Sequence, residues 1–434
     1  MKRTGKIIAL ALTVFMLAGA AGMAAASAPE ENGGIVVSLR VEGIEEPLYY
    51  NREIRLAAES TVTELLAEVN LMEDGPEIAI SDSGYGAYIS AIDSLEEFAF
   101  GAMSGWSYRV NGLSPTFGID QCVLEDGDEV VCFYGDPFGI GMQYPAVDIS
   151  RLFSDGIVKF TSVDATYDED WNEILTENPV AAAIVSFDGD PFTTNDDGEI
   201  ALADTAGIAG FHKLQIERYD EETGVPTVLR LAPDFEIYVP FADTPDDAWY
   251  TDAVMYCVRD GYLVGTDLAL NLFAPQDYMR TPQLITVLAR IAGLDRESTT
   301  GGDWYRAPLE WAVVNHIVDL SDDDIAVVDS VGGIDAYYRQ IAMETVTRQE
   351  FIRMFCLTAE YAVENGIGVY DMTLRADITG ATDYDLIDEG ALEAVSWAVA
   401  AGIIMGTDSE ALTIDPAYKV SRAVVCRMLL NYYS

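Results

Sequence analysis

The sequence predicts a multidomain chain with three regions of different class: an α+β domain, an all-β sandwich and a C-terminal all-α region. Strand-like apolar runs, with one helical stretch among them, dominate up to about residue 240, and helical apolar spacing dominates after it. A hydroxyl–Arg pair then opens two helical runs, Thr347-Arg348 and Ser421-Arg422, and the reversed pair Arg280-Thr281 opens a third. Three copies of one unit indicate an internal repeat.

Composition and charge limit the class of partner. Of the 434 residues, 50% are apolar and 10% aromatic, which supplies material for packed cores and is unlike a disordered acidic tail. The formal net charge is −49. A phosphate-binding surface needs clustered Lys and Arg, and because the sequence has no such cluster we expect no nucleic-acid partner. The charge is interpreted as a solvated surface, with divalent-cation binding or adaptation to salt as alternatives.

The N-terminus has the pattern of a secretory signal peptide over residues 1–28. A basic start is followed by an apolar run, Ile7 to Ala20, and by a small-residue cleavage motif, Ala26-Ser27-Ala28. The apolar run is short for a membrane span, and no later stretch approaches transmembrane length. We therefore expect a secreted mature chain without a transmembrane segment, which attaches to the cell surface or wall through a folded module.

Residues 33–137 are expected to form the α+β domain. Thr61-Val62-Thr63-Glu64 is a capping-box signature that predicts a helix, and strand-like runs lie on both sides of it. Asn111-Gly112 predicts a tight turn, because these residues favour positive φ. Two segments carry the most informative residues, Gly105–Gly112 and Leu124–Val130.

These two segments resemble the transcobalamin-like β-grasp family. The matching features are a core Trp, a turn and a Gly-Asp strand entry, which mainly determine the fold. The family includes cobalamin-contacting domains of vitamin carriers and also many bacterial surface proteins. The resemblance implies a β-grasp fold, and no cofactor is expected. A corrinoid or another small ligand stays open as an alternative, since a fold alone does not specify a ligand.

Residues 138–240 are expected to form the all-β region. Several strand-like runs are separated by turn clusters rich in Asp, Asn and Gly, and the run His212–Tyr219 alternates polar and apolar residues. The pattern resembles an immunoglobulin-like or a carboxypeptidase-regulatory-like β-sandwich, which is a common spacer module.

Residues 241–434 carry three similar units, at about 241–295, 302–360 and 374–434. In each unit a first helical run is followed, after a loop, by the paired hydroxyl and Arg residues that open a second run. The units resemble S-layer homology repeats. The resemblance implies a pseudo-threefold trimer whose grooves bind secondary cell-wall polysaccharide, which is often pyruvylated. A guanidinium can hold a ketal carboxylate through two hydrogen bonds, and an aromatic ring can stack on sugar carbons.

The resemblance assigns polysaccharide binding to particular residues. Arg348 and Arg422 are the expected ligand contacts, and Thr347 and Ser421 are expected to cap the helices or to donate hydroxyl groups. The remaining candidates match the opening Asp, the aromatic position and the second Gly of the repeat, and Arg280 completes the set: Asp243, Asp377, Trp249, Trp304, Gly265, Gly406 and Arg280.

The three units depart unevenly from the repeat pattern. In the first, the pair is reversed and Pro282 follows, so Arg280 is expected to point elsewhere. In the second, His316 and Leu320 stand where glycines are expected, and the acidic segment 321–324 replaces the loop. An alternative interpretation is that each Arg pairs with an acidic neighbour from another unit.

The function that follows is a non-enzymatic surface protein, anchored non-covalently to wall polysaccharide and displaying β-rich modules. No catalytic residue and no metal site is predicted. Two alternatives remain: a surface-tethered protein that binds a small, corrinoid-like ligand, and a glycan-acting enzyme with a carboxylate pair. The five cysteines are an odd number, and a disulfide between Cys122 and Cys132 stays open.

Overall fold

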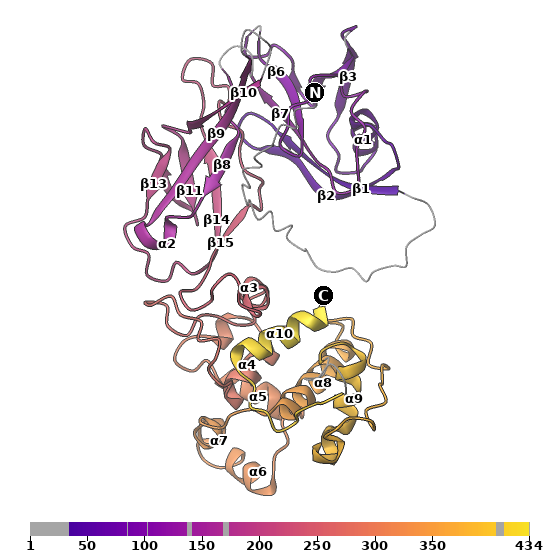
Figure 1. The fold of residues 1–434 in the computed structure, drawn as a ribbon, viewed down its shortest axis with the longest axis vertical. Helices are drawn as coiled ribbons and strands as arrows, with labels where there is room; N and C mark the ends of the chain where they lie inside the picture. Colours follow the sequence, from indigo (N-terminus) through magenta and orange to yellow (C-terminus); the bar gives the residue numbers. More distant parts are fainter. Residues whose placement is uncertain are drawn as a thin grey trace, which may run out of the picture. The chain divides into compact units, whose positions relative to one another are not determined.

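The structure, a computed structural model, describes residues 34–84, 86–101, 103–136, 141–167, 173–404 and 412–433. The expected signal peptide, residues 1–28, lies outside them. The described chain contains two β-rich regions followed by a helical region, in the order that the sequence predicts (Figure 1). In this described part, no helix is both long and apolar enough to cross a membrane.

The first region is an α+β domain, as predicted. Its main sheet has the order β2-β1-β7-β6, in which β1 and β7 are parallel and the other pairs are antiparallel. A smaller sheet has the order β3-β4-β5. The elements are β1 (Gly34–Glu42), β2 (Pro47–Ala57), α1 (Val62–Val69), β3 (Ile78–Asp82), β4 (Ala87–Ile92), β5 (Leu95–Glu96), β6 (Gly105–Val110) and β7 (Glu129–Gly135).

Local chemistry explains these elements. The Thr61 side chain accepts a hydrogen bond from the Glu64 amide and the Glu64 carboxylate accepts one from the Thr61 amide, so the predicted capping box begins α1. The predicted turn has φ 49° at Asn111 and 74° at Gly112. β7 is buried on both faces, because one face enters the core of this domain and the other, with Val131 and Phe133, packs against the next region.

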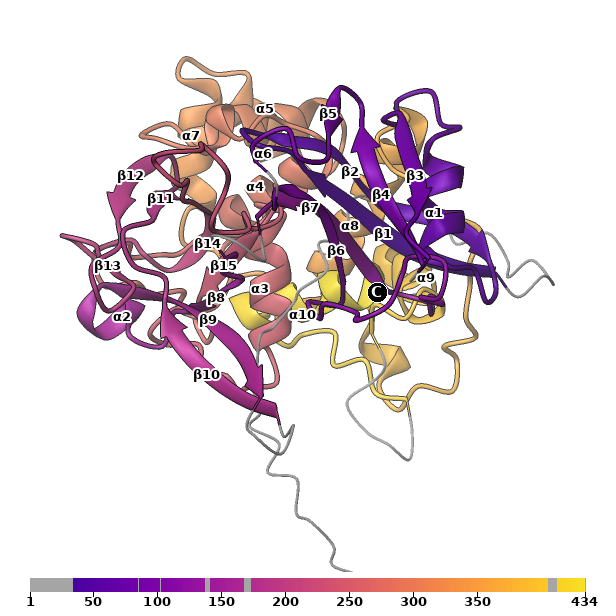
Figure 2. The same ribbon diagram turned by 90° about the horizontal axis from the view of Figure 1, so that it is seen from above.

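The second region consists of two sheets that share one core. One sheet has the order β10-β9-β13 with β8 also paired to β9, and the other has the order β12-β11-β14-β15 (Figure 2). The sequence runs indicated β11, β13, β14 and β15 but not the remaining strands. The elements are β8 (Pro145–Asp148), α2 (Leu152–Asp155), β9 (Ile157–Tyr167), β10 (Glu173–Pro179), β11 (Ile184–Phe187), β12 (Asp190–Thr193), β13 (Glu199–Ala201), β14 (Gly210–Glu217) and β15 (Glu236–Val239).

The third region is helical, and its helices share one continuous apolar core. The acidic segment at 321–324, which replaces the expected loop of the second unit, begins a helix, because Ser321 and Asp324 form a capping box. The helices are α3 (Thr251–Arg259), α4 (Thr281–Ile291), α5 (Arg306–Val314), α6 (Asp322–Val328), α7 (Gly333–Ile341), α8 (Arg348–Glu364), α9 (Leu392–Ala400) and α10 (Arg422–Tyr433).

A ring of backbone hydrogen bonds joins the three helical units. The Met279 amide donates to the Val420 carbonyl, the Val420 amide to the Val346 carbonyl, and the Val346 amide to the Met279 carbonyl. Each of these residues lies two positions before the first residue of α4, α8 or α10, so the ring fixes where these three helices begin. All three side chains are almost fully buried.

Candidate functional site

The hydroxyl–Arg pairs occupy the starts of α8 and α10. Thr347 caps α8, since its side chain accepts from the Glu350 amide and its own amide donates to the Glu350 carboxylate. Ser421 holds the same place before α10, where its hydroxyl accepts from the Val424 amide at 3.4 Å. The predicted capping role of both hydroxyls is therefore present, and Arg348 and Arg422 are the first residues of their helices.

Arg422 reaches from the third unit into the first. Its Nε donates to the Phe273 carbonyl at 2.8 Å and its Nη2 donates to the Val264 carbonyl at 2.5 Å. The guanidinium lies over the Phe273 ring, 4.4 Å from the ring centre, and the residue is only 7% exposed. Burial lowers the pKa of Arg422 from its usual value. Arg422 thus holds together two units that are far apart in the sequence.

Arg348 makes the equivalent contact between the second and third units, but it is less buried. Its Nη1 donates to the Ile414 carbonyl at 2.5 Å, and its guanidinium lies 4.9 Å from the centre of the Tyr418 ring. Its Nε is buried and has no hydrogen-bond partner among the described residues. Burial lowers the pKa of Arg348.

An Asp organises each loop that these arginines contact. Asp243 accepts from the Phe273 and Ala274 amides at 2.8 and 2.7 Å. Asp383 accepts in the same way from the two amides of the second loop, at 3.0 and 2.6 Å. The sequence had matched Asp377 to Asp243, and the structure corrects this match. The separation in sequence between the Asp and its loop, 30 residues for Asp243 and 31 for Asp383, could have identified Asp383.

Asp377 has a local role instead. It accepts hydrogen bonds from the Thr379 amide at 3.0 Å and the Thr379 hydroxyl at 2.6 Å, which forms a side-chain turn. The Thr379 hydroxyl and amide lower the pKa of Asp377. The predicted polysaccharide contact of Asp377 stays a prediction.

The first unit has a different helix start. Arg280 occupies the capping position of α4, one residue earlier than the other two arginines, and points elsewhere as expected. Its guanidinium contacts the Ala342 carbonyl at 3.5 Å and the Met343 sulfur. Three positions after the ring residues Met279, Val346 and Val420 stand Pro282, Gln349 and Ala423. The amides of Gln349 and Ala423 each donate a hydrogen bond to a neighbouring unit, whereas Pro282 has no N–H to donate.

The two candidate tryptophans occupy equivalent positions in the first and second units. Trp249 and Trp304 stand directly before the Tyr residues that begin α3 and α5. Each indole is perpendicular to its neighbouring Tyr ring, with centres 5.3 Å apart for Trp249–Tyr250 and 5.9 Å apart for Trp304–Tyr305. Trp249 is 53% exposed, and Trp304 is half-buried beside Tyr338 of α7. Apolar rings of this kind are available for stacking.

The two candidate glycines have different outcomes. A Cβ atom at Gly265 would lie 2.8 Å from the Phe241 ring and 3.1 Å from the Leu272 carbonyl, so close packing requires glycine there. Gly406 lies outside the described residues.

Acidic residues surround both arginines, but none of them forms a close ion pair with either in the described chain. In the described chain, no carboxylate is within ion-pair distance of Arg348 or Arg422, although the sequence has 73 acidic residues. The alternative that each Arg pairs with an acidic neighbour is thus not observed. Each guanidinium also lies at a helix N-terminus, where the helix dipole adds positive potential. Acidic groups act on both arginines from beyond ion-pair distance: Asp277 and Asp243 on Arg422, and Asp415 and Asp383 on Arg348.

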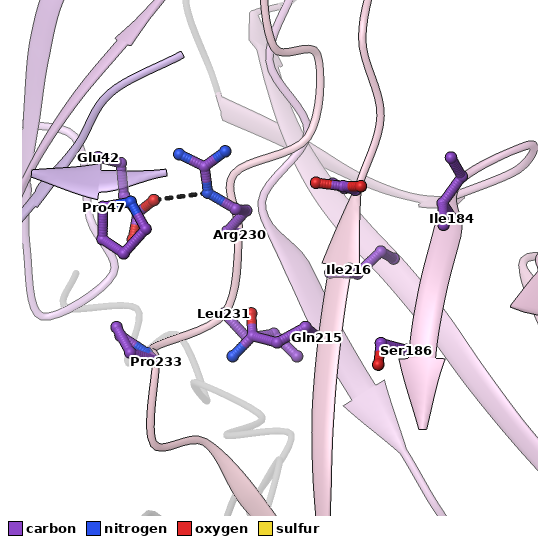
Figure 3. Close-up of a pocket in the computed structure, with 10 residues that line it drawn as sticks. Glu42, Pro47, Ile184, Ser186, Gln215, Ile216, Arg230, Leu231 and Pro233 are labelled. Atoms are coloured by element: carbon purple, nitrogen blue, oxygen red, sulfur yellow. Dashed lines mark hydrogen bonds and ion pairs between the residues drawn. The ribbon is translucent and has the colours of Figure 1, made fainter. Parts of the chain in front are cut away.

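A cleft of about 360 Å³ lies where the first and second regions meet (Figure 3). Its floor is one face of β11 and β14, where Ile184 pairs with Glu217 and Ser186 with Gln215. Pro47, from the start of β2, lines the cleft as well. Nothing in the sequence indicated this cleft.

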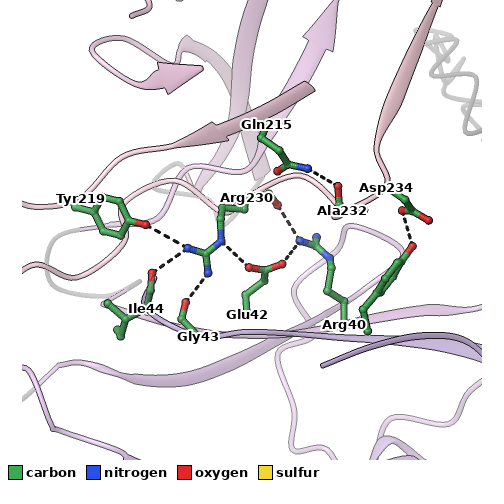
Figure 4. Close-up of polar contacts among 10 residues, drawn as sticks. Arg40, Glu42, Gly43, Ile44, Gln215, Tyr219, Arg230, Ala232 and Asp234 are labelled. Carbon is green, nitrogen blue, oxygen red and sulfur yellow. Dashed lines mark hydrogen bonds and ion pairs between the residues drawn. The ribbon is translucent and has the colours of Figure 1, made fainter. Parts of the chain in front are cut away.

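Buried charges form one wall of the cleft (Figure 4). Glu42 accepts from Arg40 at 2.8 Å and from Arg230 at 2.7 Å, and all three side chains are at most 11% exposed. Arg230 also donates to the carbonyls of Gly43 and Ile44, at 2.8 and 2.9 Å. The network joins β1 to the segment before β15, so it connects the first region to the second.

The thiols and carboxylates show no metal site. All five cysteines are buried and free, so the disulfide between Cys122 and Cys132 is not formed in this structure. Within the described ranges, no group of three or more His, Cys, Asp or Glu side chains is placed to hold a metal ion.

Comparisons with known proteins bear on the first region. A family model described as a domain of unknown function, DUF4430, matches residues 69–135. No curated protein matches the chain. Haptocorrin in complex with Cbi is similar at 17% identity and a TM-score of 0.22, over 26% of this chain and 27% of haptocorrin. A protein from Ruminococcus gnavus ATCC 29149, provisionally described as metal binding, is similar at 16% identity and a TM-score of 0.19, over 24% of this chain and 97% of its own.

The DUF4430 match lies within residues 33–137, for which the sequence suggested a transcobalamin-like β-grasp domain. The chain spans about a quarter of the length of haptocorrin.

Arg422→Ala should destabilise the helical region by about 2–4 kcal/mol, because two backbone carbonyls lose a charged donor in a buried place. Urea unfolding followed by circular dichroism measures the change. Arg280→Ala, with its weaker contacts, should stay within about 0.5 kcal/mol of the unmodified protein. Equal stabilities of the two variants would contradict the structural role of Arg422.

Glu42→Ala should destabilise the first two regions by about 3–5 kcal/mol, since it leaves Arg40 and Arg230 as buried, unpaired cations. The exposed neighbour Glu45 provides the matched control, and Glu45→Ala should change the unfolding free energy by less than about 0.5 kcal/mol. Urea titration of both variants measures these two changes. An unchanged unfolding free energy for Glu42→Ala would show that the network does not stabilise the protein.

Proposed function

We propose that this is a non-enzymatic, secreted surface protein that attaches non-covalently to secondary cell-wall polysaccharide through residues 241–434. The observation that carries the proposal is the pair of equivalent arginines, Arg348 and Arg422, each at a helix start and without a carboxylate partner in the described chain. Cations placed in this way in a strongly acidic protein favour an anionic ligand.

The arrangement of the helical units supports an S-layer homology trimer. Each of the three units contributes one backbone donor and one acceptor to the ring of Met279, Val346 and Val420. The contacts of Arg422 and Arg348 then repeat between successive pairs of units. We propose that the regions between these units are the polysaccharide grooves, and that the unit with Arg280 contributes least.

Local recognition is essential because the whole protein repels an anionic polymer. The net charge of −49 makes long-range attraction to such a polymer unfavourable. A ketal carboxylate, as in a pyruvylated sugar, would be held at short range by the partly exposed guanidinium of Arg348. The Tyr418 ring, 40% exposed, and the exposed Trp249 indole offer apolar faces for the sugar.

The wall-binding proposal is tested by pull-down of the mature protein, residues 29–434, with purified cell-wall sacculi. Arg348→Ala should weaken binding about tenfold or more, because one charged hydrogen bond to a ligand contributes roughly 1.5–3 kcal/mol. Trp249→Ala should also weaken binding, and because Trp249 is exposed this change should leave the melting temperature unaltered.

Arg375→Ala is the matched control, since Arg375 is a partly exposed arginine of the same region that pairs with Glu393. Its binding should equal that of the unmodified protein. Sacculi from which the polysaccharide has been removed by hydrofluoric acid should not bind any variant. If the Arg348→Ala variant binds sacculi as well as the unmodified protein does, Arg348 is not part of the binding site. If the protein binds sacculi that lack the polysaccharide, the polysaccharide is not its partner.

A second candidate function is capture of a small ligand, and the cleft beside β11 and β14 favours it. The mature protein is titrated with dicyanocobinamide, whose visible spectrum changes when its axial ligands change. A spectral change that Ser186→Trp abolishes, with wall binding retained, would support a ligand in the cleft. The absence of any change with excess corrinoid would remove corrinoid capture.

A further inference from the structure

Two thiols face each other across the contact between the first and third helical units. Cys257 lies on α3 and Cys426 lies on α10, and both residues are 0% exposed. The Cys257 sulfur is 3.9 Å from the backbone carbonyl oxygen of Cys426. The Cys257 thiol also interacts with the Cys426 side chain, so the two cysteines are neighbours across this contact. Such contact is the first requirement of a disulfide, whose Cα atoms lie about 4.4–6.8 Å apart.

The other three cysteines are placed differently. Cys122 and Cys132 belong to the core of the first region, and Cys356 lies on α8. Of the three cysteines in the helical region, Cys257 and Cys426 are the two that the structure brings into contact, which their spacing in the sequence did not indicate. An exported chain meets oxidising conditions in which such a pair persists as a disulfide.

A buried cation adjoins this pair. Arg422 precedes Cys426 by one turn of α10, and its guanidinium interacts electrostatically with both sulfurs. Burial raises the pKa of Cys257, so the thiol is protonated at rest, and the Arg422 charge acts in the opposite direction. A nearby cation favours the thiolate, which is the form that attacks a disulfide.

We propose that Cys257 and Cys426 are a dithiol that closes to an intramolecular disulfide when the contact between α3 and α10 opens and one of the two thiols reacts with a low-molecular-weight disulfide. One thiolate attacks a sulfur of the oxidant, whose S–S bond breaks and releases one thiolate, leaving a mixed disulfide on the protein. The second protein thiolate attacks the bonded protein sulfur, and the second half of the oxidant leaves. The protein loses two protons and two electrons, and the oxidant becomes two thiols.

The bond would fix the same contact that Arg422 holds by hydrogen bonds. It would close the long loop from α3 to α10, and a cross-link of a long loop restricts the unfolded chain strongly. The first and third units could then no longer separate. A consequence for wall attachment rests on the proposed function, whereas the disulfide itself does not.

The test uses the full mature protein, purified under reducing conditions and then incubated with oxidised glutathione. Free thiols are counted in denaturant after an acid quench, and the linked peptides are identified by mass spectrometry. We expect the count to fall from five to three, with Cys257 and Cys426 in one cross-linked peptide. The oxidised protein should also melt at a higher temperature than the reduced one.

Two variants control for the identity of the pair. Cys356→Ser should still lose two thiols and gain the same cross-linked peptide, whereas Cys257→Ser should not form it. Five free thiols after oxidation, a bond only between Cys122 and Cys132, or lasting glutathione adducts on Cys257 and Cys426 would each overturn the proposal. Because these readouts do not involve the cell wall, they separate its failure from a failure of wall binding.

Discussion

The helical region depends on three backbone hydrogen bonds that close a ring between segments far apart in the sequence. A bond of this kind contributes modestly to stability by itself, but an unpaired buried amide or carbonyl would be costly. Removing any one of Met279, Val346 and Val420 from the ring would leave one buried donor and one buried acceptor without partners. The three units are therefore required together, and the starts of α4, α8 and α10 follow from the ring.

Three buried or partly buried arginines make contacts between parts of the chain. Other arginines, such as Arg151 and Arg375, form exposed ion pairs with nearby carboxylates. In contrast, Arg422 and Arg348 bind carbonyls of a neighbouring unit, and Arg230 binds Glu42 and two carbonyls across the junction of the first two regions. Planar guanidinium groups suit this use because they can donate several hydrogen bonds in fixed directions.

Local signals in the sequence predicted the helix starts and the order of the three regions, because capping boxes and apolar periodicity depend on neighbouring residues. Contacts between distant segments were not predictable. The contacts of Asp383 form only because the chain folds back and places the loop at Ile414 beside it. The ion pair between Glu42 and Arg230 joins residues about 190 positions apart. The helix at Ser321 was also missed, since acidic runs usually indicate solvated loops.

The ring also sets the order in which the region can assemble. Met279 is synthesised early, but its acceptor Val420 follows 141 residues later. Until that residue emerges, the ring stays open and α10 has not yet packed on α3, so the region cannot reach its final packing unit by unit. The helical region of a nascent chain would thus need protection from premature association, in contrast to repeat proteins in which each unit packs only on its neighbour.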